Sequence, residues 1–261
     1  MAQLTEQRQA PLTFRDEFKL VHLRLHHHAP EDFFRSQWQS ELKSALFLIY
    51  RWILAIFFGT GLCSYLIIFF SRGTVFIYLT NWGFILCSVT SISGAIFVSI
   101  YHASTESIVN RRCMLKCYWA CYWINLIFTH IISIIYWTCI FPKKQPQNLI
   151  SGIYNVWTHG LPPVFFTLDH LLVAHPARLL HFIYPFGLAL LYVIFTYVYY
   201  VLGGLDRLGR SYIYEMLNHG NPLQTLKTIV MVAVLLVCCS TLQYGVYRLR
   251  VCIASKLGKL L

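Results

Sequence analysis

The sequence predicts an all-α polytopic membrane protein, a bundle of about six transmembrane helices. Of its 261 residues, 57% are hydrophobic and only 12% are charged, whereas soluble domains carry about 25% charged residues. The apolar residues also gather in runs of about 20, the length at which a helix crosses the hydrocarbon core. We therefore expect one membrane domain over residues 44–247, between a cytosolic N-terminal tail (1–43) and a basic cytosolic C-terminal tail (248–261).

The N-terminal tail is polar and contains no signal-peptide core. Hydrophobic residues recur there at helical spacing, at Phe14, Phe18, Val21 and Leu25. This spacing is typical of an amphipathic helix lying on a membrane surface, and a partly ordered tail is the alternative. The triplet His26–His28 does not predict a metal site, because consecutive side chains on a helix point in different directions.

Six predicted spans follow the tail, at 45–70, 75–101, 117–141, 152–174, 179–202 and 223–247. The connections between them are short, except for Gly203–Pro222, which contains several turn-forming residues. The sequence contains no internal repeat or linker. We therefore expect no second folded domain.

Lysine and arginine are divided unevenly between the two sides of this predicted bundle. Fourteen lie on the side that holds both termini and six on the other side, while Arg51 falls inside the first span. Because cytosolic loops carry the excess of Lys and Arg, both termini are predicted to be cytosolic. The net charge of +11 does not indicate nucleic-acid binding, since the basic residues are scattered between apolar spans.

The fourth span contains residues that a lipid-facing helix should not carry. His159, Pro162, Pro163, Asp169 and His170 lie there in apolar surroundings. Charged groups in a membrane usually face a bundle interior, so we expect the other spans to enclose this one.

Arg51 lies close to the cytosolic end of the first span, and Asp169 is predicted at a similar depth in the fourth. The Arg51 side chain can extend to the membrane surface. Alternatively, it can form a buried ion pair with Asp169, which would satisfy both charges.

Thr80 and His159 form a candidate catalytic pair. Both lie about 9–11 Å below the non-cytosolic surface, at 1.5 Å of helix rise per residue. A histidine base can activate a threonine hydroxyl for attack on a lipid ester, and Asn81 or Asn155 could stabilise the oxyanion. The alternative is that these side chains only form hydrogen bonds within and between helices.

Metal binding is not predicted. His170, His175 and His181 lie near Asp169 in the sequence, but their spacing matches no metal motif. The nine cysteines contain no CxxC pair. We therefore expect neither a metal nor a cofactor.

Several segments carry a resemblance to a known family: FRSQW (34–38), FIYLTNWGF (76–84), LDHLLVAHPARLLHFIYP (168–185) and GGLDRLGRSYIYEML (203–217). Through them the chain resembles the rolling stone family of multi-pass membrane proteins. The resemblance implies a plasma-membrane protein with about six spans. It also implies a role in myoblast fusion during muscle development, because the founding member is associated with that process.

A more distant similarity is to the androgen-induced family of intramembrane threonine hydrolases. Those enzymes cleave fatty acid esters of hydroxy fatty acids, and the resemblance implies Thr80 as nucleophile and His159 as base. The leading hypothesis is a rolling-stone-type protein acting in cell–cell fusion or membrane organisation, with the lipid bilayer and unidentified proteins as partners. The alternatives are a lipid-ester hydrolase, and a transporter or channel whose path is lined by Asp169, Arg51 and the histidines.

Overall fold

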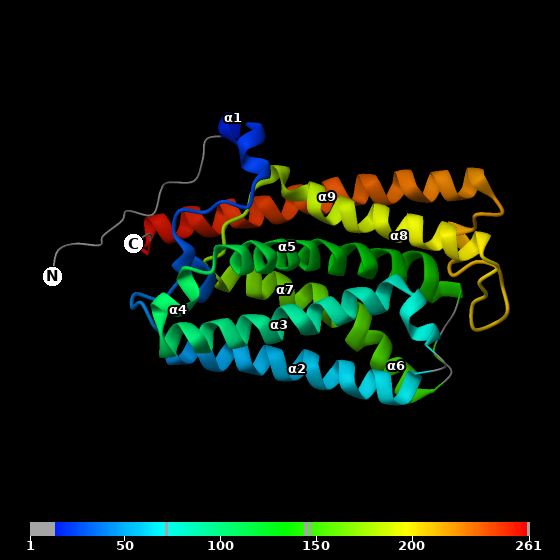
Figure 1. Cartoon of the computed structure of the whole chain (residues 1–261), viewed down its shortest axis with the longest axis horizontal. Helices are drawn as coiled ribbons and strands as arrows, with labels where there is room; N and C mark the ends of the chain where they lie inside the picture. Colours follow the sequence, from blue (N-terminus) through cyan, green and yellow to red (C-terminus); the bar gives the residue numbers. More distant parts are fainter. Residues whose placement is uncertain (1–13, 71–72, 144–145, 147, 260–261) are drawn as a thin grey trace.

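The computed structural model describes residues 14–70, 73–143, 146 and 148–259. These residues form long helices packed side by side (Figure 1), with no strand among them and one isolated bridge between Ser36 and Val173. Five described segments are long and apolar enough to cross a membrane: α2 (Ala45–Phe69), α3 (Leu79–Ala103), α5 with the turns that continue it (Arg112–Lys143), α8 with the turn before it (Leu179–Val201) and α9 (Pro222–Lys256). The prediction of an all-α polytopic membrane protein is confirmed.

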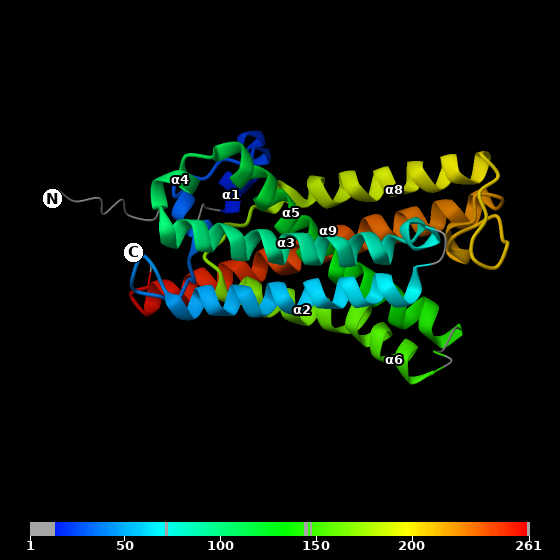
Figure 2. The same ribbon diagram turned by 60° about the horizontal axis from the view of Figure 1, so that its bottom comes forward.

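The predicted fourth span is a composite of three consecutive helical segments. They are α6 (Leu149–Asn155), the π-helical turn η6 (Val156–Gly160) and α7 (Leu161–Leu172). Pro162 and Pro163 lie in the first turn of α7. A helix tolerates proline there, because the N–H groups of the first turn have no partner within the helix. The π-turn η6 immediately precedes this proline pair, so the chain remains helical from α6 into α7. The composite returns along the bundle beside α2 (Figure 2).

The other helical segments are short. Before the bundle lie α1 (Phe14–Glu17), η1 (Leu20–Leu23) and η2 (Pro30–Phe34). Within it lie η3 (Thr74–Ile77), α4 (Thr105–Val109), α5 itself (Arg112–Ile135), η4 (Tyr136–Ile140), η5 (Phe141–Lys143), η7 (Leu179–Phe182), α8 itself (Ile183–Val201) and η8 (Glu215–Leu217). The predicted amphipathic helix corresponds to α1 and η1, and residues 1–13 of that tail lie outside the described residues.

Helix α9 is longer than the span predicted at 223–247. It continues through Lys256, so most of the predicted C-terminal tail that the structure describes is helical. Residues 260–261 of that tail lie outside the described residues.

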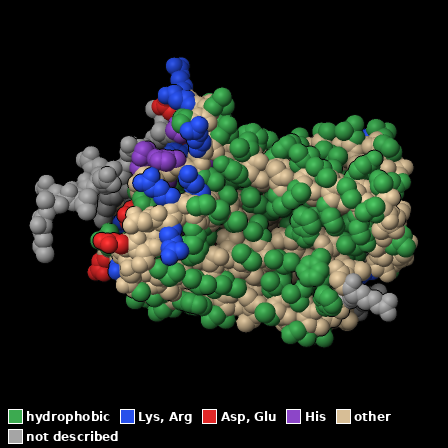
Figure 3. Space-filling view, viewed as in Figure 1, with side chains coloured by type: hydrophobic (Ala, Val, Ile, Leu, Met, Phe, Trp, Pro, Cys, Tyr) green, Lys and Arg blue, Asp and Glu red, His purple; other side chains and the backbone are tan. Residues whose placement is uncertain are grey.

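The centre of the bundle is rich in aromatic residues. Trp119, Trp123, Phe58, Phe84 and Phe166 are each at most 2% exposed. Hydrophobic side chains also cover the outer surface along the helices, whereas Lys and Arg gather at one end in the view of Figure 3. Soluble monomers rarely expose such a continuous apolar surface, and this distribution suits helices that face lipid.

Candidate functional site

A buried ion pair joins α2 and α7. Arg51 Nη1 in α2 lies 2.8 Å from Asp169 Oδ1 in α7, and the two side chains are 2% and 0% exposed. The Tyr50 hydroxyl donates to the same Asp169 oxygen at 2.9 Å, and Arg51 Nη2 donates to the Tyr118 hydroxyl at 2.7 Å. Buried charges need such additional hydrogen bonds to offset their desolvation. Arg51 therefore pairs inside the bundle and does not extend to the membrane surface.

Gly94 of α3 leaves room for this polar cluster. A Cβ atom at this position would lie 2.7 Å from the Tyr118 hydroxyl and 3.2 Å from Arg51 Nη2. Contacts below 3.0 Å require a neighbour to shift. The absence of a side chain at Gly94 therefore allows Arg51 and Tyr118 to approach α3.

A second buried arginine, Arg250 of α9, fastens the segment that follows α7. It donates to the backbone carbonyl oxygens of His170 and, at 2.6 Å, of His175. Helix α7 ends at Leu172, and the last carbonyls of a helix have no partner within it. Arg250 supplies such a partner, so it connects α9 to the polar end of the bundle.

The three histidines near Asp169 each make a different contact. His170 Nε2 donates to the carbonyl of Gln243, and His175 Nε2 to that of Phe33, each at 3.1 Å. The His181 ring packs edge-on against Trp119. In the described part of the chain, no three His, Cys, Asp or Glu side chains form a group that could hold a metal ion.

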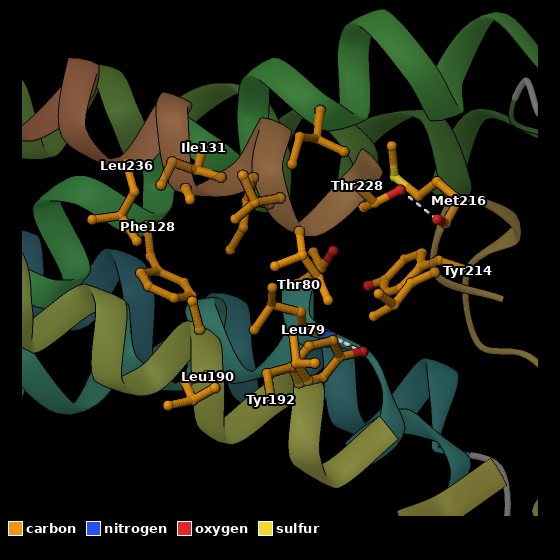
Figure 4. A pocket seen from close by; sticks show the side chains of 18 of the residues that line it. Leu79, Thr80, Phe128, Ile131, Leu190, Tyr192, Tyr214, Met216, Thr228 and Leu236 are labelled. Carbon is orange, nitrogen blue, oxygen red and sulfur yellow. Dashed lines mark hydrogen bonds between the residues drawn. The ribbon is translucent and has the colours of Figure 1, made fainter. Parts of the chain in front are cut away.

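Thr80 lines an apolar cavity of about 180 Å³ between α3, α5, α8 and α9. In Figure 4 it lies near Tyr214, with Phe128, Leu190 and Leu236 toward the other end of the cavity. Burial raises the pKa of Tyr214, while its hydrogen-bonding contact with Thr80 acts in the opposite direction. The Thr80 side chain therefore lies beside the hydroxyl of a tyrosine from the segment that connects α8 to α9.

The rest of the cavity wall is mostly apolar. Two of its other hydroxyls are engaged: Tyr192 donates to the carbonyl of Ile77 at 2.8 Å, and Thr228 donates to that of Met216. Leu190 of α8, which also lines the cavity, is 51% exposed. The cavity thus extends to a half-exposed residue on the outer side of α8.

His159, the proposed partner of Thr80, is engaged elsewhere. Its ring stacks on Tyr136, with centroids 3.4 Å apart, and its Nδ1 lies 3.0 Å from the Asn155 carbonyl oxygen and 2.8 Å from Thr158 Oγ1. No hydrogen bond within the described residues joins it to Thr80. This geometry gives the hydrolase hypothesis no support.

The two candidate oxyanion donors are likewise not gathered around Thr80. Asn81 Nδ2 donates to the carbonyl of Val75 at 2.5 Å. Asn155 contributes its backbone carbonyl to the contact with His159.

The sequence did not single out Tyr50, Tyr118 or Arg250 as members of the polar cluster. Tyr118 is one of many aromatic residues in its span, so nothing distinguishes it. Arg250 lies in the predicted tail, although its neighbours Val251 and Ala254, both buried, continue an apolar helix face. That continuation is the signal that could have placed Arg250 inside the bundle.

Comparison with known proteins finds similarity over most of the chain. The family model described as Protein rolling stone matches residues 10–258. Protein rolling stone of Drosophila melanogaster is 36% identical to this chain over 228 residues, which cover 84% of this chain and 82% of the relative. No solved structure matches the chain.

Proposed function

Because the chain belongs to the rolling stone family of membrane proteins, we propose that it acts in cell–cell fusion, as in the fusion of myoblasts, or in organising the membrane at which cells fuse. The observation that carries the proposal is the match over more than four-fifths of both chains. Such a match relates the entire bundle, not an isolated motif, to the family. The polar cluster then has a structural role, holding the crossings in register.

The proposed location is the plasma membrane, with both termini in the cytosol. Helix α1 and the C-terminal end of α9 lie at the same end of the bundle (Figure 1), and Lys and Arg gather at that end (Figure 3). The excess of basic residues on cytosolic loops supports this orientation. The sequence contains no Asn-x-Ser/Thr sequon, so single sequons can be introduced to test it. Glycosylation is expected within 204–221 and not within 36–42, and the reverse pattern would contradict the orientation.

The cavity beside Thr80 supports a contact with lipid as part of membrane organisation. Its wall is apolar and it opens at α8, so it suits a hydrocarbon chain and not a polar solute. The transporter alternative gains no comparable observation.

A rescue experiment tests the fusion proposal. The protein is depleted from fusion-competent myoblasts of the organism that expresses it, and nuclei per myotube are counted after re-expression. Wild-type protein should restore fusion, and so should Thr80→Val and His159→Gln at matched surface levels, because the proposed role needs no nucleophile. Normal fusion after depletion would overturn the proposal. Rescue by wild type but by neither variant would favour the lipid-ester hydrolase instead.

A further inference from the structure

A second cavity, of about 200 Å³, lies at the end of the bundle that holds the described parts of both termini. Its wall includes the histidine triplet, two basic residues from the first turns of α5 and a buried tryptophan of the same helix. These residues are His26, His27, His28, Arg112, Lys116 and Trp119. We call it the histidine–basic cavity. Its chemistry differs from that of the apolar cavity beside Thr80, because cations and imidazoles dominate its polar wall.

Among the described residues, the two basic side chains of this cavity have no ion-pair partner. Arg112 and Lys116 are exposed and four residues apart on α5, a spacing at which like charges repel. Neither has an ion pair with another described residue. The carboxylate of Asp32, beside the cavity, accepts from His27 Nε2 at 2.9 Å. An anion between Arg112 and Lys116 would relieve their repulsion.

The charges converge on the same space. Burial lowers the pKa of His26, and the charges of His28, Arg112 and Lys116 lower it further. The His26 ring adds a hydrogen-bond donor to the wall, while Arg112 and Lys116 supply positive charge. The start of α5 adds the partial positive charge of a helix N-terminus, where no side chain caps the free N–H groups.

The position of the cavity along the bundle identifies the source of the anion. The segment Arg112–Lys143 has 32 residues, which corresponds to about 48 Å of helix, against a hydrocarbon core of about 30 Å. The excess leaves room for the charged first turns, which carry Arg112 and Lys116, to extend into the headgroup layer. Trp119 also lines the cavity, and its Nε1 donates to the carbonyl of Pro176 at 2.9 Å. A bilayer that covers the apolar middle of this segment would place the cavity near the lipid phosphates.

We infer that the histidine–basic cavity binds the phosphorylated headgroup of an anionic phospholipid. Arginine can contact a phosphate with two parallel hydrogen bonds, and lysine and imidazole add single donors. Anionic lipids are concentrated in the cytosolic leaflet, where basic pockets between helices bind such headgroups. The inference rests on the orientation proposed above and is independent of the role in fusion.

Thermal unfolding of the purified full-length protein in detergent micelles tests the inference. The probes are dioctanoyl phosphatidylinositol 4,5-bisphosphate, dioctanoyl phosphatidylcholine and inorganic phosphate. A ligand that binds only the folded state raises the melting temperature. The bisphosphate lipid should raise it in wild type, and the choline lipid and inorganic phosphate at the same concentration should not. Arg112→Gln/Lys116→Gln should lose the shift.

The matched control is Lys19→Gln/Lys256→Gln, which removes two exposed charges from the same end but outside the cavity. It should keep the wild-type shift. Equal loss in both double variants would overturn the inference in favour of diffuse attraction, and an equal shift with inorganic phosphate would replace the lipid by a free anion. If Arg112→Gln/Lys116→Gln does not fold, Lys116→Gln alone should reduce the shift, and an unchanged shift would overturn the inference. None of these outcomes depends on whether cells fuse.

Discussion

Arg51 and Asp169 lie 118 residues apart in the sequence and 2.8 Å apart in the folded bundle. Either charge, buried without its partner, would destabilise the fold. The pair therefore fixes how α2 and α7 are rotated about their axes relative to each other. The shared hydroxyls of Tyr50 and Tyr118 extend this constraint to α5.

Arg51→Ala should destabilise the protein by about 3–5 kcal/mol, because it leaves the Asp169 carboxylate buried without its charge partner. The yield of folded protein in detergent and its melting temperature measure the effect. Lys143→Ala provides the control, since Lys143 and Glu215 form a pair that is 69% exposed on both sides, worth about 0–1 kcal/mol. Equal melting temperatures for wild type and Arg51→Ala would rule out a structural role for the pair.

Gly94→Ala should cost about 1–3 kcal/mol, the range for overpacking a close-packed interior. The added methyl group would enter the space of the Tyr118 hydroxyl and Arg51. Gly187→Ala in α8 is the control, because nothing lies within 4 Å of a Cβ there, and alanine is the better helix former. Thermal unfolding should separate the two variants, and similar melting temperatures would show that the cluster accommodates the methyl group.

Arg250→Ala should destabilise the protein by about 1.5–3 kcal/mol, because it removes charged hydrogen bonds to the carbonyls of His170 and His175. Hydrogen exchange should rise in residues 173–178, which follow α7. Lys256→Ala, exposed on the same helix, should change neither quantity. Exchange that rises only in α9 would indicate that Arg250 does not fasten this segment.

The connection between α8 and α9 should open in acid. Burial raises the pKa of Asp206, but hydrogen bonds from the Arg210 side chain and from the N–H groups of Arg210 and Leu208 outweigh this effect and hold it below its usual value. A carboxylate with a lowered pKa stabilises the fold above its unfolded pKa, about 3.9, and this stabilisation is lost as the pH falls through the folded pKa.

Hydrogen exchange of residues 204–212, corrected for intrinsic rates, should therefore accelerate in that acidic range in the wild type. Asp206→Asn should show faster exchange already at neutral pH and little further acceleration. Glu215→Gln, which removes an exposed carboxylate of the same connection, should behave as wild type does. Identical pH profiles for wild type and Asp206→Asn would contradict this role of Asp206.

The pairing of Arg51 with Asp169 could be predicted from their positions along the predicted spans, but rotation about each helix axis could not. Counting residues from the predicted span ends placed Arg51 and Asp169 at similar depth, and they do pair. The same counting placed Thr80 and His159 at similar depth, but Tyr214 lies against Thr80 and Tyr136 stacks on His159. Which side chains meet depends on how the helices pack and on how the connection between α8 and α9 folds back onto the bundle. Neither feature leaves a periodic pattern in the sequence.

The π-turn η6 at Val156–Gly160 shifts the helical phase between α6 and α7. Each residue of an α-helix advances the chain by about 100° around its axis, so one extra residue in a turn changes which sector of α7 faces inward relative to α6. Deleting a single residue there would leave both halves helical and equally apolar, yet it would swing Asp169 away from Arg51. The length of one turn thus determines which neighbours α7 meets.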